Sequence, residues 1–451
     1  MHQTLGIQVF LILSTINIIV SFACNCLLHS RDYRCKLGTK TPYRCIANHD
    51  DSPLEYPDCV PNKIWLLVRH GTRYPSKTYI GLMKDKLPEL QQIILGNYQR
   101  NKTELTAEDA KLLANWEVSI SEDDVKNLVE EGENEMIDLG ERYQSRFPSV
   151  MPDTYNNRTY KFKYTATQRT EESAKHFVTG LFGRHNSQNV WYPKAEHRDP
   201  VLRFYKHCHR WRLEVDKNVS AQAETNKFLK SETYIKMLQD VSKRIGHPVD
   251  HETAYLMYVT CAFETAWQTN FESPWCKMFS LNDFKILEFF QDLKYYWVDG
   301  YGHKLTYEQA CPALRDMFDF FTSVEESSVS AYFSHSGAML KLLALLRVAK
   351  DDQHLTHDLF PLYGTDRAWR TGIIDSFASN IAFVLYNCSS KGPSILFMHQ
   401  ERPLYLPGCP LNVPCPLSIM KALYPDHEEE CHFAAMCSVA DKVELQTDTD
   451  S

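Results

Sequence analysis

One histidine lies between two arginines directly after a short apolar stretch. Residues 63–68 (KIWLLV) are almost continuously apolar, and Arg69, His70, Gly71 and Arg73 follow them. A neutral imidazole can attack phosphorus, and guanidinium groups can hold the non-bridging oxygens of a phosphate through paired N–H donors. A glycine beside the histidine allows the backbone to approach such an anion closely. The arrangement therefore predicts phosphoryl transfer at the end of a buried strand.

Two further segments repeat this order of strand, polar break and helix. Residues 160–164 alternate aromatic and charged side chains, and Arg169 follows them; residues 329–333 are strand-like, and His335 follows them. In an open α/β sheet, ligands bind beyond the carboxyl ends of the strands. We therefore expect Arg169 and His335 to meet the first segment in one crevice.

The pattern along the chain predicts an α/β fold with a mixed, mostly parallel sheet flanked by helices. Residues 186–328 are rich in aromatics at helical spacing and contain no clear strand, which predicts an inserted helical cap. The α/β domain would then comprise residues 24–185 and 329–451. Two more strands are expected within its second part, at 380–386 and 394–398.

Composition and charge limit the class of protein. The 451 residues include 49 Lys and Arg against 57 Asp and Glu, a formal net charge of −8, so the chain lacks the excess of basic residues typical of nucleic-acid binding. Hydrophobic residues make up 43%, enough for a buried core. We expect a small phosphorylated molecule, and no nucleic acid, as the partner.

The N-terminus and the cysteines indicate the secretory pathway. Residues 5–22 are almost all apolar, so 1–23 are predicted to be a signal peptide, and the protein to be secreted or lumenal in the endoplasmic reticulum. The alternative is that residues 1–23 are not cleaved and anchor the protein in a membrane. Contact with a membrane is expected only in that case. All 14 cysteines follow this segment, which favours disulfides whose pairing the sequence leaves open. Segments 207–209 and 427–432 lack the spacing of a standard zinc site. Four glycosylation sequons are present: Asn101, Asn157, Asn218 and Asn387.

Several motifs resemble one known family. Residues 69–75 (RHGTRYP) resemble the RHGxRxP motif of histidine acid phosphatases, in the form found in the multiple inositol polyphosphate phosphatase branch. Residues 128–140 and 167–174 are similar to two further motifs of the family, and residues 273–302 to the insert of that branch. The resemblance covers roughly residues 59–415.

The resemblance implies an activity and a site. His70 would be the nucleophile that forms a phosphohistidine, and His335 the second catalytic histidine. Phosphate-binding residues would be Arg69, Thr72, Arg73 and Arg169. Neither a metal nor a cofactor would be needed. Inositol polyphosphates would be the main substrates, with bisphosphoglycerate as a further candidate.

The sequence departs from this family at one place. The branch usually reads His-Ala-Glu after the second histidine, and relatives read His-Asp, whereas this chain reads His335-Ser336-Gly337. A carboxylic acid there protonates the leaving oxygen, and a positioned general acid accelerates a reaction by about 10²–10⁴-fold. Glu401, Asp375 or a water could replace it. The alternatives are a phosphatase for better leaving groups, such as aryl phosphates, or a catalytically impaired relative that binds phosphoesters.

Overall fold

The computed structural model describes residues 24–27, 31–269, 271–364, 366–424 and 431–439. The predicted signal peptide, residues 1–23, lies outside the described residues.

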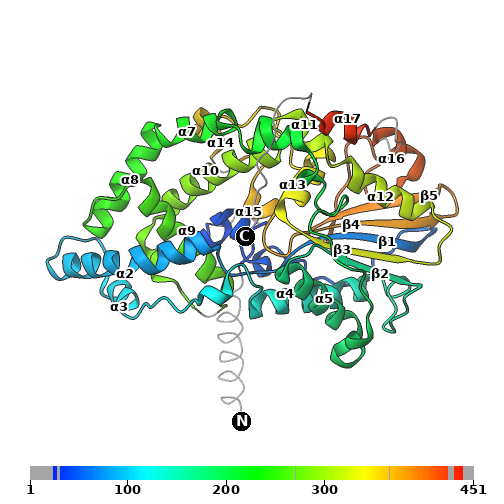
Figure 1. The fold of residues 1–451 in the computed structure, drawn as a ribbon, viewed down its shortest axis with the longest axis horizontal. Helices are drawn as coiled ribbons and strands as arrows, with labels where there is room; N and C mark the ends of the chain where they lie inside the picture. The colour runs from blue at the N-terminus through cyan, green and yellow to red at the C-terminus, as the bar shows by residue number, and fades with distance from the viewer. Residues whose placement is uncertain (1–23, 28–30, 270, 365, 425–430, 440–451) are drawn as a thin grey trace, which may run out of the picture.

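A seven-stranded mixed sheet forms one side of the molecule (Figure 1). Its strand order is β2-β3-β1-β4-β5-β6, and β7 pairs with β5. The strands are β1 (Cys59–Arg69), β2 (Tyr160–Tyr164), β3 (Val329–Ser334), β4 (Asn380–Cys388), β5 (Gly392–His399), β6 (Arg402–Pro403) and β7 (Cys415–Pro416).

The sheet is mixed, as expected, but its parallel part is smaller than expected. Only the β1–β3 and β2–β3 pairings are parallel, and β4 to β7 pair antiparallel. Residues 389–391 join β4 to β5, and so short a connection permits only an antiparallel pair.

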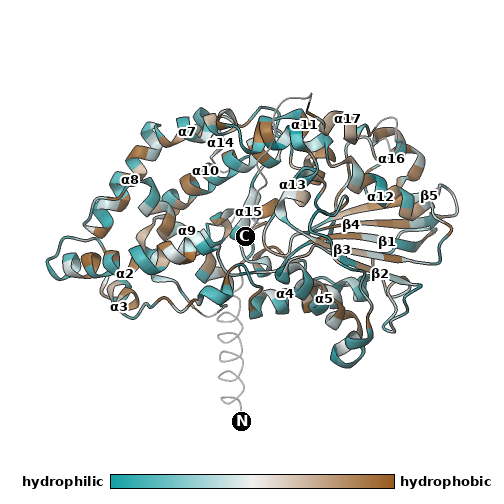
Figure 2. Cartoon of the chain, viewed as in Figure 1, coloured by the Kyte–Doolittle hydropathy of each residue, from teal (hydrophilic) through white to brown (hydrophobic). Residues whose placement is uncertain are grey.

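Strand β1 is buried on both faces, which explains its continuous apolar run. Ile64, Leu66 and Val68 enter one hydrophobic cluster, and Trp65 and Leu67 enter the other. Helices α4 (Glu130–Arg146) and α5 (Gln168–Asn186) contribute to the first cluster, and α12 (Cys311–Thr322) and α13 (Ser336–Leu345) to the second. In Figure 2 hydrophobic colour runs along the strands of the sheet.

A group of helices lies beside the sheet domain (Figure 1). The described residues of 186–328 contain no strand. Their main helices are α7 (Ala223–Leu229), α8 (Glu232–Ile245), α9 (His251–Trp267) and α10 (Leu281–Asp299). Helices α2 (Lys77–Gln99) and α3 (Ala107–Ala114) precede the predicted insert but pack with these helices rather than on the sheet. The shorter helices are α6 (His209–Trp211), α11 (Lys304–Glu308), α14 (Phe360–Tyr363), α15 (Thr371–Ile374), α16 (Leu417–Leu423) and α17 (Phe433–Cys437).

Seven disulfides pair all 14 cysteines, which confirms that these residues form disulfides. The pairs are Cys24–Cys45, Cys26–Cys35, Cys59–Cys388, Cys208–Cys437, Cys261–Cys276, Cys311–Cys431 and Cys409–Cys415. Such bonds persist in oxidising compartments. Within the described ranges, no helix has both the length and the apolar character that crossing a membrane requires.

Candidate active site

The two histidines meet because their strands run parallel and end together. Arg69 on β1 pairs in register with Ser334 on β3, and each histidine is the first residue after its strand. The ring centroids of His70 and His335 are 5.6 Å apart. Arg169, at the start of α5, places its Nη2 3.4 Å from His335 Nδ1. The predicted convergence of three separate segments is therefore present.

The His70 ring is held in one orientation. Its Nδ1 lies 2.9 Å from the carbonyl oxygen of Gly71, and because a carbonyl only accepts, Nδ1 carries the proton. The Nε2 nitrogen forms no hydrogen bond with any described residue. Burial lowers the pKa of His70 well below its usual value, and the nearby charges of Arg169, Arg69 and Arg73 lower it further. The ring is therefore neutral at physiological pH, with the Nε2 lone pair available as a nucleophile.

The His335 ring is bonded at both nitrogens. Arg169 Nη2 donates to Nδ1 at 3.4 Å, so Nε2 carries the proton and donates to Thr165 Oγ1 at 2.9 Å. Burial, followed by the charge of Arg169, lowers the pKa of His335 well below its usual value. In this arrangement His335 orients Arg169. His335 can contact a phosphate only if one of its two hydrogen bonds is replaced by a bond to the phosphate.

Three arginines surround His70 with little negative charge to balance them. Arg69 Nη1 donates to the carbonyl oxygen of Thr39 at 2.8 Å, and its guanidinium lies 4.9 Å from the Phe377 ring centroid. Burial, then neighbouring arginines, lowers the pKa of Arg73 to about 9 and that of Arg169 to about 10. Both groups stay cationic at neutral pH, and an oxyanion placed between them would relieve their mutual repulsion.

Thr72 does not face this group. It is fully buried, and both its backbone N–H and its hydroxyl donate to Glu135, at 2.7 and 2.9 Å. The expectation that Thr72 contacts substrate is therefore not met; the residue fixes the loop against α4. Gly71 is required for the same contact, because a Cβ there would lie 2.5 Å from the Gly132 carbonyl oxygen. The close approach that needs glycine is thus to backbone rather than to an anion.

Lys40 joins the cluster from the N-terminal disulfide-rich segment. Its Nζ lies 5.7 Å from the Phe263 ring centroid, the same ring that Arg73 faces at 5.7 Å. Burial, together with the charges of Arg73 and Arg69, lowers the pKa of Lys40 to about 7. Sequence reasoning missed this residue because it follows no strand and belongs to no recognised motif.

We expect the protein to take up a proton when a polyanion binds at pH 8. Lys40 is largely neutral there, and a bound anion raises its pKa, so about one proton enters with the ligand. Calorimetry of inositol hexasulfate, which does not titrate in this range, in buffers of different ionisation enthalpy measures the uptake. Lys40→Met should remove it, and the exposed Lys236→Met should not. Equal uptake by both variants would contradict the assignment.

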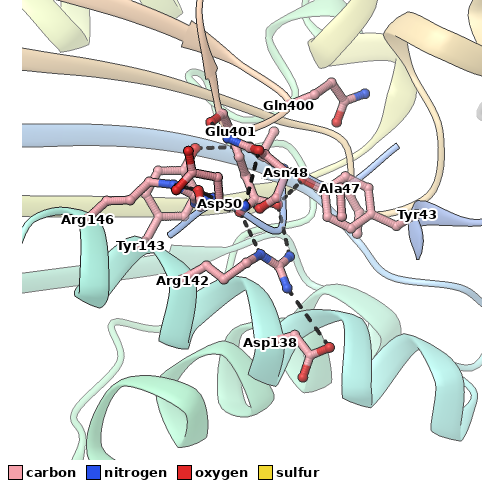
Figure 3. Close-up of polar contacts among 12 residues, drawn as sticks. Tyr43, Ala47, Asn48, Asp50, Asp138, Arg142, Tyr143, Arg146, Gln400 and Glu401 are labelled. Carbon is pink, nitrogen blue, oxygen red and sulfur yellow. Dashed lines mark hydrogen bonds and ion pairs between the residues drawn. The ribbon is translucent and has the colours of Figure 1, made fainter. Parts of the chain in front are cut away.

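Glu401 cannot donate a proton in the reaction. Its carboxylate accepts from Arg146 Nη1 at 2.6 Å, Arg142 Nε at 2.7 Å and the Tyr43 hydroxyl at 2.5 Å (Figure 3). Burial alone would raise the pKa of Glu401, but the hydrogen bonds and charges of the arginines outweigh it, and the pKa is lowered. The group is an ionised acceptor that joins the N-terminal segment to α4, so this candidate for the missing acid is eliminated.

The position that carries the acid in the resembled family is tightly packed here. A Cβ on Gly337 would lie 3.2 Å from Cζ of the buried Tyr205 ring, and 3.4 and 3.5 Å from its Cε atoms. Tyr205 thus occupies the space beside residue 337.

Gly337→Glu alone is therefore expected to give no gain in hydrolysis of alkyl phosphates. Forcing a side chain against Tyr205 should instead lower the free energy of unfolding by about 1–3 kcal/mol, the usual penalty for overpacking. Phosphate release from glycerol phosphate and urea unfolding measure the two effects. Gly81→Glu, where nothing lies within 4 Å of a Cβ, is the control. A several-fold rate gain in Gly337→Glu would contradict this prediction and show that the Tyr205 ring moves aside for the new side chain.

Comparison with known proteins assigns the family. A family model described as "Histidine phosphatase superfamily (branch 2)" matches residues 63–399. The chain belongs to this superfamily. It is therefore grouped with enzymes that hydrolyse phosphomonoesters, and the predicted membership is confirmed.

Individual relatives agree with this assignment. The chain is 33% identical over 383 residues to multiple inositol polyphosphate phosphatase 1 of Drosophila melanogaster, covering 81% of this chain and 80% of the relative. Its fold matches the phytase from D. castellii with a TM-score of 0.71 at 16% identity, over 90% of this chain and 88% of that one. The fold also matches that of the multiple inositol polyphosphate phosphatase of Bifidobacterium longum in complex with inositol hexasulfate. The TM-score is 0.62 at 15% identity, and the match covers 87% of this chain and 98% of that one. These structures confirm a histidine phosphatase fold.

Proposed function

We propose that the protein hydrolyses inositol polyphosphates through a phosphohistidine on His70. The observation that carries this proposal is the His70 ring, buried and neutral, with its Nδ1 proton held by Gly71 and its Nε2 directed away from that bond. Arg69, Arg73 and Arg169 provide guanidinium groups around it. Such a site supplies a nucleophile and charge neutralisation, the two requirements of phosphoryl transfer without a metal.

The reaction has two displacements at phosphorus. In the first, His70 Nε2 attacks while the three guanidinium groups hold the non-bridging oxygens, and the leaving oxygen departs with a proton. In the second, water attacks the phosphohistidine and releases inorganic phosphate. His335 orients Arg169 during both steps, and Thr72 positions the loop that carries His70.

The surplus of positive charge supports a substrate with several phosphates. Lys40 lies close enough to Arg73 and Arg69 for their charges to lower its pKa. Arg203 lies close enough to Arg169 to lower the pKa of that group. One phosphate cannot neutralise all of these groups. The names of the relatives agree with this class of substrate. Bisphosphoglycerate carries two phosphates and would be hydrolysed by the same steps.

The compartment is proposed from the covalent chemistry. Seven disulfides favour the lumen of the endoplasmic reticulum or the exterior of the cell. Asn101, Asn157 and Asn387 are exposed, and Asn218 is half-buried. Glycosylation of these four residues is a prediction from the sequons. Membrane attachment would require retention of residues 1–23.

Phosphate release from inositol hexakisphosphate by the purified protein tests the function. We expect turnover, and rapid quenching with labelled substrate should leave acid-labile phosphate on His70. The second candidate function is binding without turnover, which the absence of an acid at residues 336 and 337 favours. Calorimetric binding without phosphate release between about pH 4 and pH 8 would establish that alternative and exclude the first.

A further inference from the structure

Asp375 brings a carboxyl group to the strand ends from a distant part of the chain. It follows α15 and is completely buried. Its backbone oxygen accepts a hydrogen bond from Arg69 Nη1 at 2.5 Å, and its carboxyl Oδ2 lies 3.7 Å from the same nitrogen. The carboxyl is therefore beside the arginine that precedes the nucleophile.

Only weak partners favour the ionised form of the Asp375 carboxyl. Neither of its oxygens forms a hydrogen bond with a described residue, and the 3.7 Å to Arg69 exceeds hydrogen-bond length. The groups that face it are Arg69 on β1, Ser336 at the start of α13 and Asp299 at the end of α10. Burial raises the pKa of Asp375 to about 7, and the lowering effects of Arg69 and the Ser336 hydroxyl are smaller. The group thus holds a proton at acidic pH and is about half protonated near pH 7.

Ser336 can connect this proton to the reaction once its hydroxyl rotates to bond the Asp375 carboxyl. It directly follows His335, is half-buried, and lies near enough to the carboxyl to affect its pKa. Asp375 itself is inaccessible, so it cannot touch a substrate. We propose that Asp375 supplies the proton of the leaving oxygen through the Ser336 hydroxyl. This inference rests on the proposed phosphatase reaction and assigns its missing acid to a residue outside the family motif.

The protons balance over both displacements. As the His70 Nε2–P bond forms and the P–O bond to the leaving group breaks, the leaving oxygen takes the Ser336 hydroxyl proton, and Ser336 takes the proton of Asp375. The resulting carboxylate faces Arg69. When water attacks phosphorus and the P–N bond breaks, the proton of water returns through Ser336 to Asp375. His70 and Asp375 are then as they began.

Two other groups fit this role less well. Glu401 is ionised among Arg142, Arg146 and Tyr43. Tyr205 lies beside Gly337, but burial raises its pKa, and its hydroxyl interacts with Arg203. Tyr205 is therefore kept as the rival in the test.

The test compares leaving groups in Asp375→Asn. On inositol hexakisphosphate, whose alkoxide must be protonated, we expect kcat to fall by about 10²–10⁴-fold. On p-nitrophenyl phosphate, whose leaving group needs no proton, we expect less than about a tenfold loss. Ser336→Ala should show the same selectivity. In the wild type, kcat on the alkyl substrate should decline as pH rises through about 7, and Asp375→Asn should lose this decline.

Controls separate this role from a structural one. Glu264 is also a buried carboxyl whose pKa burial raises to about 7, but it bonds Trp116 and Ser273 in the cap, so Glu264→Gln should not discriminate between substrates. Equal losses on both substrates in Asp375→Asn would assign the residue to positioning of Arg69 and overturn the proposal. Selectivity in Tyr205→Phe instead of Asp375→Asn would also overturn it.

The proposed function can fail separately. His70→Ala that retains p-nitrophenyl phosphate hydrolysis would overturn the phosphohistidine mechanism whatever Asp375 does. A wild-type protein that hydrolyses inositol hexakisphosphate, together with an Asp375→Asn variant that loses no selectivity between the two substrates, would overturn only the role of Asp375. Absence of all turnover would overturn both.

Discussion

His70→Ala protein is expected to hydrolyse neither inositol hexakisphosphate nor p-nitrophenyl phosphate at a useful rate, with kcat lowered by about 10⁴-fold or more on both. Both substrates are affected because each must pass its phosphoryl group to Nε2. Removing the ring leaves the arginines in place, so substrate binding should persist. Phosphate release and calorimetric binding, measured on the same preparation, check the two halves of this prediction.

His176→Ala is the matched control for this variant. His176 lies on α5, where its Nδ1 bonds the Glu172 carbonyl and its Nε2 lies 3.5 Å from Glu133. It takes no part in the cluster around His70, so kcat should change little. Loss of binding together with turnover in His70→Ala would show that the substitution collapses the site, and the loss of rate would then not identify a nucleophile.

Glu401→Gln is expected to destabilise the protein by about 3–5 kcal/mol at pH 7, because it leaves two buried guanidinium groups without their carboxylate. Glu401 and Arg146 are almost completely buried, and water cannot replace the lost charge. Urea unfolding with the disulfides intact measures the change. Glu326→Gln breaks only an exposed ion pair with Arg158 and should leave the midpoint unchanged.

The cost of Glu401→Gln should depend on pH. The folded protein lowers the pKa of Glu401 below its ordinary 4.5, so the carboxylate stabilises the fold fully above that value and progressively less as pH falls through the folded pKa. Wild type and variant should therefore converge in stability as the pH falls below the folded pKa of Glu401. A difference that stays constant from pH 7 to below that pKa would show that lost packing, not lost charge, is responsible. Phosphohistidine formation should be unaffected in the folded variant.

Local patterns were sufficient to predict the parts of the site that lie at strand ends. The apolar residues 63–68 predict a strand that is buried on both faces, and the motif at residues 69–73 directly follows this strand. Parallel pairing in register then brings His70 and His335 together, as the repeated strand-and-helix order predicted. The even number of cysteines and the apolar N-terminus likewise indicated disulfides, although not which cysteines pair.

Several functional details depend on contacts between distant segments. The sequence showed that residues 336 and 337 carry no acid, but it ranked neither Glu401 nor Asp375 as a replacement. Glu401 is 358 residues from Tyr43 and 255 from Arg146, and these partners keep it ionised. Asp375 is 306 residues from Arg69, whose Nη1 lies 3.7 Å from its carboxyl without a hydrogen bond between them.

Amino-acid order alone thus indicated the proposed nucleophile, its flanking arginines and the strands that carry them, because a strand and the residues at its end are adjacent in the chain. The antiparallel pairing of β4 with β1, the position of Lys40 beside Arg73 and the raised pKa of Asp375 depended on tertiary structure. Burial and the charges of distant neighbours set a pKa, and neither can be read from nearby residues.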